Sequence, residues 1–196
     1  AELERQGALP AEYWILDLSA DLRERQRETL QQHVPHLLPR VEWLERLPEA
    51  LDGMVVANEV LDAMPVERFV VRGDQVRSLG VRAQPERLQA CEAEAPAALA
   101  DAVRAIGRDT GVAWPEGYTS EVNLGLAGWL QALAAAVARG VLLFVDYGLP
   151  RREYYATERR DGTLLCHFRH RFHDDPFARP GLQDITAWVD FSAVAE

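Results

Sequence analysis

The stretch "GMVVANEVLDAMPVERFVV", residues 53–71, decides the fold class that the sequence predicts. It begins with an apolar run, Met54–Ala57, that has strand-forming character and ends in the polar pair Asn58 and Glu59. Buried strands that deliver polar groups at their carboxyl ends are typical of open α/β sheets, which bind ligands in the crevice outside those ends. We therefore expect a ligand site at this point, with Asp62 close to it.

Similar segments occur on both sides of this stretch. Further strands are predicted at Tyr13–Leu18, Val41–Leu44 and Val141–Val145. Helices are predicted at Ala20–Val34, Pro96–Asp109 and Leu124–Gly140. Apolar strands that alternate with helices indicate a parallel sheet covered by helices on both faces. The predicted fold class is therefore α/β.

An antiparallel element interrupts this alternation. Val66–Arg72 and Gln75–Arg82 have strand character and flank the turn dipeptide Gly73-Asp74, which predicts a β-hairpin. We expect one domain over residues 1–196, with an inserted β-hairpin and helical element at about residues 66–122.

The charge balance excludes several classes of protein. The 196 residues carry 31 acidic and 21 basic side chains, a formal net charge of -10, which disfavours nucleic acid and insertion into a membrane. All the basic side chains are arginine, so the chain cannot form a Schiff base through lysine. The two cysteines, Cys91 and Cys166, have no metal or redox spacing, which favours a reduced, cytoplasmic setting.

Three of the predicted strands end in an acidic residue: Asp17, Glu59 and Asp146. Each acid alone could simply cap a helix or accept loop amides. Together they would line one edge of a sheet, where an acid at the end of the second strand can accept both ribose hydroxyls of an adenosine cofactor. We assign that role to Asp17. The glycine-rich turn that should precede it is not found in residues 1–16.

Several blocks of the chain, in order, resemble the MidA family of S-adenosylmethionine-dependent methyltransferases. They are "YWILDLSADLRERQRETL", "GMVVANEVLDAMPVERF", "SEVNLGLAGWL", "VLLFVDYG", "REYY" and "GTLLCHFRHRFHDDPFARPGLQDITAWVDFSA". The resemblance implies a Rossmann-like class I methyltransferase sheet whose first strand and glycine loop lie outside this sequence, so that the domain is expected to be incomplete at both ends. It implies S-adenosyl-L-methionine as cofactor and S-adenosyl-L-homocysteine as product. The cofactor would contact Asp17, Leu18, Ser19, Trp43, Leu44, Asn58 and Glu59.

The mitochondrial member of this family methylates an arginine of a complex I subunit, which implies a protein that presents an arginine as substrate. A guanidinium is a planar cation that carboxylates can hold through two parallel hydrogen bonds. The candidate catalytic carboxylates are Glu59, Asp62 and Glu121, and the candidate substrate-side residues are Asp146, Tyr147, His170 and Asp184. Two structural alternatives stay open: Asp62 could cap a helix, and Trp43 could pack in the core instead of on adenine.

The segment "CHFRHRFHDDP", residues 166–176, is rich in the residue types that bind metal ions: cysteine, histidine and aspartate. The spacing His-x-x-His-x-x-His suits neither a helix face nor a strand face, so we expect no metal. We expect instead that the histidines, Arg169 and Arg171 hydrogen-bond to carboxylates in a loop over the site, with Asp184 and Thr186 among the partners.

Two other functional classes are alternatives to the methyltransferase. A nicotinamide oxidoreductase is disfavoured, because a Tyr-x-x-x-Lys pair requires a lysine. A non-catalytic assembly or binding module with a methyltransferase-like fold stays open, as does a homodimer formed through the hairpin around Gly73. The expected location is the bacterial cytoplasm, and the resemblance implies the mitochondrial matrix for the related eukaryotic proteins.

Overall fold

The computed structural model describes residues 2–85 and 87–196. The chain divides into two compact units, one formed by the residues up to Gly53 together with Ala135–Gly140, the other by Met54–Ala134 together with Val141–Glu196. The predicted organisation as one domain with an insertion stays a prediction. Among the described residues, no helix combines the length and the apolar character that crossing a membrane requires.

The first unit is built on two parallel strands, β1 (Tyr13–Leu16) and β2 (Val41–Leu44), which pair from Tyr13 with Val41 to Leu16 with Leu44. Parallel strands need a crossover connection. Here it consists of α2 (Ala20–His33) and the short 3₁₀ helix η1 (Pro35–Arg40); α1 (Glu2–Arg5) precedes β1. The predicted strands and helix are confirmed, and the parallel pairing brings the residues after Leu16 to the same edge as the end of β2.

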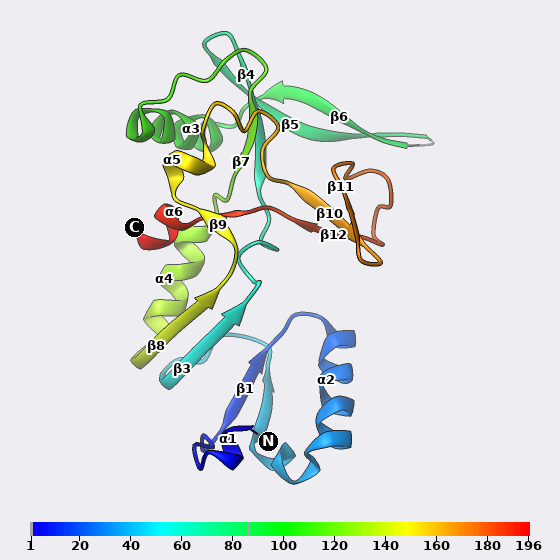
Figure 1. Ribbon diagram of the computed structural model, residues 1–196, viewed down its shortest axis with the longest axis vertical. Coiled ribbons are helices and arrows are strands. Elements are labelled where there is room, and N and C mark those ends of the chain that lie inside the picture. Colours follow the sequence, from blue (N-terminus) through cyan, green and yellow to red (C-terminus); the bar gives the residue numbers. More distant parts are fainter. Residues whose placement is uncertain (1, 86) are drawn as a thin grey trace. The chain divides into compact units, whose positions relative to one another are not determined.

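The strand that begins the quoted stretch is β3 (Leu51–Asn58), and its hydrogen-bonded neighbour is β8 (Val137–Val145). Gly53 lies against Gly140 near the start of both strands, and the Glu59 amide donates to the Val145 carbonyl, 2.8 Å away, at their ends. The two strands are therefore parallel, as their arrows in Figure 1 show.

The two faces of this strand pair differ. One face of the strand pair is covered by a hydrophobic cluster that includes residues of helix α4 (Leu126–Ala136). In this cluster the ring centres of Trp129, on α4, and Phe144, on β8, lie 5.9 Å apart. Strand side chains alternate between faces. The apolar residues of the opposite face are all exposed: Met54, Val56, Val141, Leu143 and Val145.

The predicted helix from Leu124 to Gly140 is wrong at its carboxyl end, because the helix stops at Ala136 and β8 begins at Val137. The residues after Ala136 pair with β3 instead of continuing the helix. Arg139 forms an ion pair with Asp52, with 2.7 Å between Nη2 and Oδ2. A Cβ on Gly140 would lie 1.8 Å from the Gly53 carbonyl oxygen, so glycine permits this close approach.

The largest sheet is antiparallel and has the strand order β6-β5-β4-β7 (Figure 1). Its strands are β4 (Glu67–Arg72), β5 (Gln75–Gln84), β6 (Arg87–Glu94) and β7 (Thr119–Val122). The predicted hairpin is confirmed, since Arg72 pairs with Gln75 across Gly73-Asp74. Strands β6 and β7 were not predicted, because neither has an apolar pattern of its own.

Helix α3 (Ala97–Thr110) supplies part of the core beside this sheet. Leu99, Val103 and Ile106 recur at the spacing of one helical face, and all three are buried. The helix ends where Gly111 adopts a left-handed conformation, with a φ of 69°. The same core cluster contains Phe69 and Tyr118.

The chain after β8 consists of short elements. They are β9 (Gly148–Leu149), α5 (Arg151–Tyr154), β10 (Leu165–Phe168), β11 (Arg171–His173), β12 (Asp184–Thr186), β13 (Val189–Asp190) and α6 (Phe191–Ala195). Strand β10 lies between β11 and β12 in an antiparallel sheet, and β13 pairs with β9 in parallel. The end of the chain thereby returns to the residues that directly follow β8.

We predict that Leu99→Ala lowers the free energy of unfolding by about 2–5 kcal/mol, because it removes a fully buried side chain and leaves a cavity. Urea unfolding followed by circular dichroism measures the change. The matched control is Val81→Ala on β5, where the side chain is exposed and the expected change is below about 0.5 kcal/mol. Equal losses in both variants would contradict this account of the core.

Candidate active site

The carboxyl ends of β3 and β8 bring several predicted site residues together. Asn58 is the last residue of β3, and Glu59 follows it with a φ of 49°, in the left-handed region that non-glycine residues rarely adopt. Both residues are exposed. Among the described residues, the Glu59 carboxylate has no intramolecular hydrogen-bond partner, so it is free to contact a ligand.

Asp146, directly after β8, holds the loop that follows Glu59. Its Oδ2 accepts hydrogen bonds from the backbone amides of Leu61 (2.9 Å) and Asp62 (3.3 Å), and its Oδ1 accepts from the amide of Tyr147 (2.9 Å). Carboxylate oxygens that accept backbone amides form strong, charge-assisted bonds. Asp146 therefore fixes the backbone of the loop that carries Asp62.

Asp62 is buried, with 4% of its surface exposed. Its Oδ2 accepts a hydrogen bond from the Tyr147 hydroxyl, whereas its Oδ1 is buried without a partner in the described part of the chain. A buried acceptor that lacks a donor is costly, and such groups occur at functional sites. Burial, and next the bond to Asp62, raise the pKa of Tyr147 to about 12.

Glu121, the third predicted catalytic acid, lies in the interior on β7 with 0% of its surface exposed. Its Oε1 accepts hydrogen bonds from the backbone amide of Thr163 (2.7 Å) and the hydroxyl of Tyr154 (3.0 Å). Burial raises the pKa of Tyr154, and the charge of Glu121 adds to this effect. In this position Glu121 ties β7 to the segment around Thr163.

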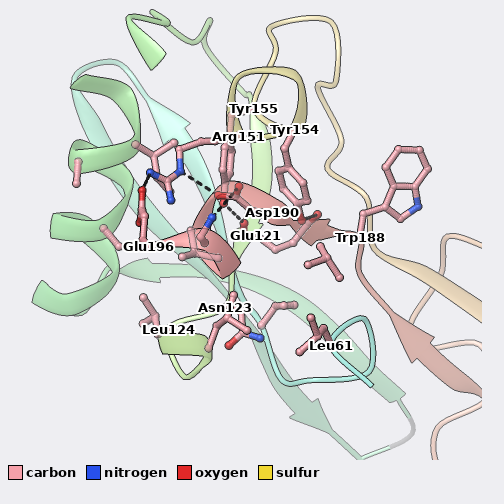
Figure 2. Close-up of a pocket in the computed structure, with 18 of the residues that line it drawn as sticks. Leu61, Glu121, Asn123, Leu124, Arg151, Tyr154, Tyr155, Trp188, Asp190 and Glu196 are labelled. Atoms are coloured by element: carbon pink, nitrogen blue, oxygen red, sulfur yellow. Dashed lines mark hydrogen bonds and ion pairs between the residues drawn. The ribbon is translucent and has the colours of Figure 1, made fainter. Parts of the chain in front are cut away.

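A cavity of about 500 Å³ lies beside these residues, between α3, α5 and α6 (Figure 2). Leu61, Glu121, Tyr154 and Trp188 contribute to its wall, so the loop that holds Asp62 reaches this cavity through Leu61. The cavity wall combines aromatic rings with carboxylates.

An arginine in the wall of this cavity is already bound by acidic side chains. The Arg151 Nε lies 3.0 Å from an oxygen of Asp190, and its Nη1 lies 3.1 Å from an oxygen of Asp109 and also contacts Glu196. Bonds to these carboxylates, that of Glu196 first, raise the pKa of Arg151. Carboxylates at this wall thus already bind one guanidinium, that of the protein's own Arg151.

The predicted adenosine-side residues lie in the first unit. Asp17 is half-buried after β1, and its Oδ1 accepts from the backbone amide of Ser19 (2.9 Å), which caps α2. Trp43 and Leu44 end β2, and the guanidinium of Arg27 lies 4.5 Å from the centre of the Trp43 ring. Leu18 is almost fully exposed.

Sequence reasoning missed one residue of this group. Gln26 of α2 donates from Nε2 to the Asp17 Oδ2 (2.9 Å) and accepts at Oε1 from the indole N–H of Trp43 (2.9 Å). It shares a helical face with Leu22 and Leu30, and a polar residue on that face was the available signal.

The remaining substrate-side candidates lie in the antiparallel sheet of β10, β11 and β12. Asp184 pairs with His167 across two strands, and His170 is exposed in the turn after β10, with a φ of 62°. The expectation that Thr186 contacts a histidine is confirmed, since it lies 3.4 Å from the His167 Nε2. The expectation for Arg169 is wrong, because its guanidinium lies over the Phe168 ring instead of on a carboxylate.

Two further titratable groups of this sheet, Cys166 and His173, are buried or half-buried. Cys166 is fully buried opposite His173, and burial raises the pKa of its thiol. Within the described ranges, no three His, Cys, Asp or Glu side chains are grouped so that they could hold a metal ion.

Residues 3–196 match the family model described as a putative S-adenosyl-L-methionine-dependent methyltransferase. The chain belongs to this family. It is also 29% identical over 164 residues to a fly protein, the protein arginine methyltransferase NDUFAF7 homolog, mitochondrial, of Drosophila melanogaster. That match covers 78% of this chain and 34% of the fly protein.

Two solved structures from Burkholderia thailandensis are similar to the chain. One, with S-adenosyl-homocysteine bound, is 44% identical with a TM-score of 0.87, over 98% of this chain and 49% of that one. The other, a native structure, is 42% identical with a TM-score of 0.88, over 99% of this chain and 51% of that one. The chain therefore spans about half the length of these relatives and a third of the fly protein. The predicted family and the class I methyltransferase-like fold are confirmed.

We predict that the Tyr147 hydroxyl ionises with a midpoint near pH 12, against an ordinary value of about 10. Because the folded-state pKa is raised, the stabilisation that this group contributes is complete below about pH 10 and is lost as the pH rises toward 12. Tyrosine ionisation is followed by ultraviolet absorbance as the pH is raised, in the wild type and in Tyr147→Phe. The difference between the two titration curves gives the midpoint of Tyr147. In Asp62→Asn the midpoint should fall, because a neighbouring negative charge is removed; a midpoint unchanged by that substitution would contradict the contact.

Proposed function

We propose that the protein is an S-adenosylmethionine-dependent methyltransferase that methylates an arginine side chain of another protein. Family membership and the S-adenosyl-homocysteine-bound relative support the reaction class, and the name of the fly relative supports arginine as acceptor. The observation that carries the proposal is the pair of acids after β3, where Glu59 is open to solvent and Asp62 keeps a buried oxygen without a donor.

The residues after β1 fit the ribose of the cofactor. Each carboxylate oxygen of Asp17 accepts one hydrogen bond from within the chain, from Ser19 or Gln26. A carboxylate can accept about four hydrogen bonds in all, so both oxygens keep a free lone pair for two neighbouring hydroxyls. Asp17 would bind the ribose, with Leu18, Ser19, Trp43 and Leu44 around the adenosine. Contacts of Asn58 and Glu59 with the cofactor stay a prediction.

The residues after β3 fit a guanidinium. Glu59 would bind the planar cation through two parallel hydrogen bonds and aim one nitrogen, because carboxylate and guanidinium geometries match. Asp62 lies deeper, and its unpartnered Oδ1 is available to a nitrogen proton of the acceptor. Tyr147 would hold the other oxygen of Asp62 in place, and Asp146 would keep the loop in shape.

The reaction needs little from the protein beyond this alignment. S-adenosylmethionine supplies a methyl group on a positively charged sulfur. The carbon–sulfur bond breaks as the bond from carbon to the guanidinium nitrogen forms, and the nitrogen loses one proton. Asp62 is the group that we assign to accept that proton, and Glu59 stabilises the positive charge that remains on the acceptor.

Three further candidates have different places in this proposal. Glu121 has no exposed surface, so we assign it the support of the cavity wall through Thr163 and Tyr154. A direct catalytic role for Glu121 stays a prediction. The same holds for substrate contacts by His170, in the turn after β10, and by Asp184, on β12.

The biological setting is inferred from the relatives. A subunit of a respiratory complex I-type enzyme is our candidate acceptor. The family that the sequence resembles has a mitochondrial member with such a substrate, and the fly relative is by name a mitochondrial protein arginine methyltransferase. That relative is mitochondrial by name, whereas we propose the bacterial cytoplasm for this protein. Homodimer formation stays a prediction.

Asp17→Ala should weaken the binding of S-adenosylhomocysteine by about 1.5–3 kcal/mol, the scale of hydrogen bonds to a charged group. Isothermal titration calorimetry measures the affinity. Asp21→Ala, an exposed acid on α2, is the control and should bind as the wild type does. Unchanged affinity in Asp17→Ala would remove Asp17 from the ribose, and no binding by the wild type would favour the non-catalytic assembly module.

Glu59→Gln should leave cofactor affinity within about twofold and lower methyl transfer to arginine peptides by at least about 100-fold, because the charge that binds the guanidinium is lost. Transfer of labelled methyl from S-adenosylmethionine to peptides with arginine or lysine measures both rate and acceptor type. Glu158→Gln, an exposed acid after α5, serves as the control. Retained turnover in Glu59→Gln, or transfer to lysine, would overturn the guanidinium site.

A further inference from the structure

We propose that Gln26 is a positioning residue that sets the orientation of the Asp17 carboxylate, and thereby the preference of the protein for a ribose with both hydroxyls. The inference rests on the proposed cofactor role of Asp17 and deepens it. Gln26 lies in the second turn of α2 and is half-buried, in contrast to its exposed neighbours Arg25 and Arg27.

The chemistry of its two partners fixes the orientation of the Gln26 amide. The indole N–H of Trp43 can only donate, so the atom 2.9 Å from it must be the amide oxygen. The Asp17 carboxylate is an acceptor, so the atom 2.9 Å from its Oδ2 must be the amide nitrogen. Rotating the amide by half a turn would bring donor against donor and acceptor against acceptor. Gln26 therefore links the ends of β1 and β2 in one defined arrangement.

The Asp17 carboxylate is consequently held at both of its oxygens. The Ser19 amide, at the start of α2, donates to Oδ1, and Gln26, about two turns further along the same helix, donates to Oδ2. Two donors from one rigid helix fix the plane of the carboxylate, which a single bond would leave free to rotate about the Cβ–Cγ bond. The lone pairs that remain are thus aimed before any ligand binds, which lowers the entropy cost of binding.

Specificity for the diol follows from this arrangement. A fixed carboxylate can accept from two neighbouring hydroxyls at once, and a ligand without one of them leaves a lone pair without a donor. A carboxylate that rotates freely can turn to the single hydroxyl or to water, and so discriminates less. Gln26 should therefore affect the penalty for a missing hydroxyl more than it affects binding of the rest of the ligand.

The test is a thermodynamic cycle between Gln26 and one ribose hydroxyl, measured by calorimetry with S-adenosylhomocysteine and its 2′-deoxy analogue. The wild type should lose about 10-fold or more in affinity when the hydroxyl is removed, the scale of a hydrogen bond to a charged group. In Gln26→Met, which keeps the length of the side chain but neither hydrogen bond, that penalty should shrink to about threefold or less.

Two further variants separate positioning from a general loss of structure. Gln26→Glu keeps an acceptor for Trp43 but places a carboxylate against Asp17, so it should also lose discrimination. Gln31→Met, an exposed glutamine on the same helix, should keep the penalty of the wild type. The indole N–H resonance of Trp43 in a ¹⁵N-labelled protein should move in Gln26→Met and not in Gln31→Met, without any ligand present.

The outcomes distinguish this inference from the proposed function. If both ligands lose affinity equally in Gln26→Met and Gln26→Glu, the penalty is unchanged and the positioning role is wrong, while cofactor binding stands. If the wild type binds neither ligand, the proposed cofactor site fails, and the role of Gln26 in ribose recognition fails with it. An indole resonance that does not move in Gln26→Met would also overturn the inference, because it would remove the link to Trp43.

Discussion

The candidate site in the second unit depends on one carboxylate that does no chemistry in our proposal. Asp146 ends β8 and accepts the amides of Leu61 and Asp62, which belong to the loop after β3. Parallel strands are not joined by a tight turn, and here the Asp146 side chain ties the residues that follow the two strands to each other. The left-handed residue Glu59 leads into the loop that this carboxylate holds, and the loop carries the buried Asp62, whose carboxylate contacts Tyr147.

The acids of this protein divide by what surrounds them, not by their sequence context. Asp146 accepts backbone amides at both of its oxygens, and Glu121 accepts the Thr163 amide and the Tyr154 hydroxyl at Oε1, so both hold backbone segments together. Glu59 and Asp62 each keep acceptor capacity unused, one in solvent and one in the interior. Unused capacity alone does not separate the acids, since the Glu121 Oε2 is also buried without a partner in the described part of the chain. Asp146 and Glu121 differ from the other two because their carboxylates bind backbone amides of other segments.

Sequence alone predicted the parts of the structure that local patterns determine. The apolar runs located β1, β2, β3 and β8, and Gly73-Asp74 located the hairpin. The boundary between α4 and β8 was missed because it depends on pairing with β3, far away along the chain. The burial of Glu121 was missed for the same reason, since Thr163 and Tyr154 come from segments 33–42 residues away. The Gln26 link was equally invisible, because the hydrogen bond to Trp43 depends on how α2 lies on β2.

The open apolar face of β3 and β8 affects how this polypeptide behaves in solution. Met54, Val56, Val141 and Leu143 favour association between molecules, whereas the net charge of -10 keeps molecules apart. Added salt weakens the second effect and not the first, because the screening length falls from about 30 Å at 0.01 M to about 8 Å at 0.15 M ionic strength. Colloidal stability of the isolated chain should therefore decrease as salt is added, and dilute buffers of low ionic strength suit it best.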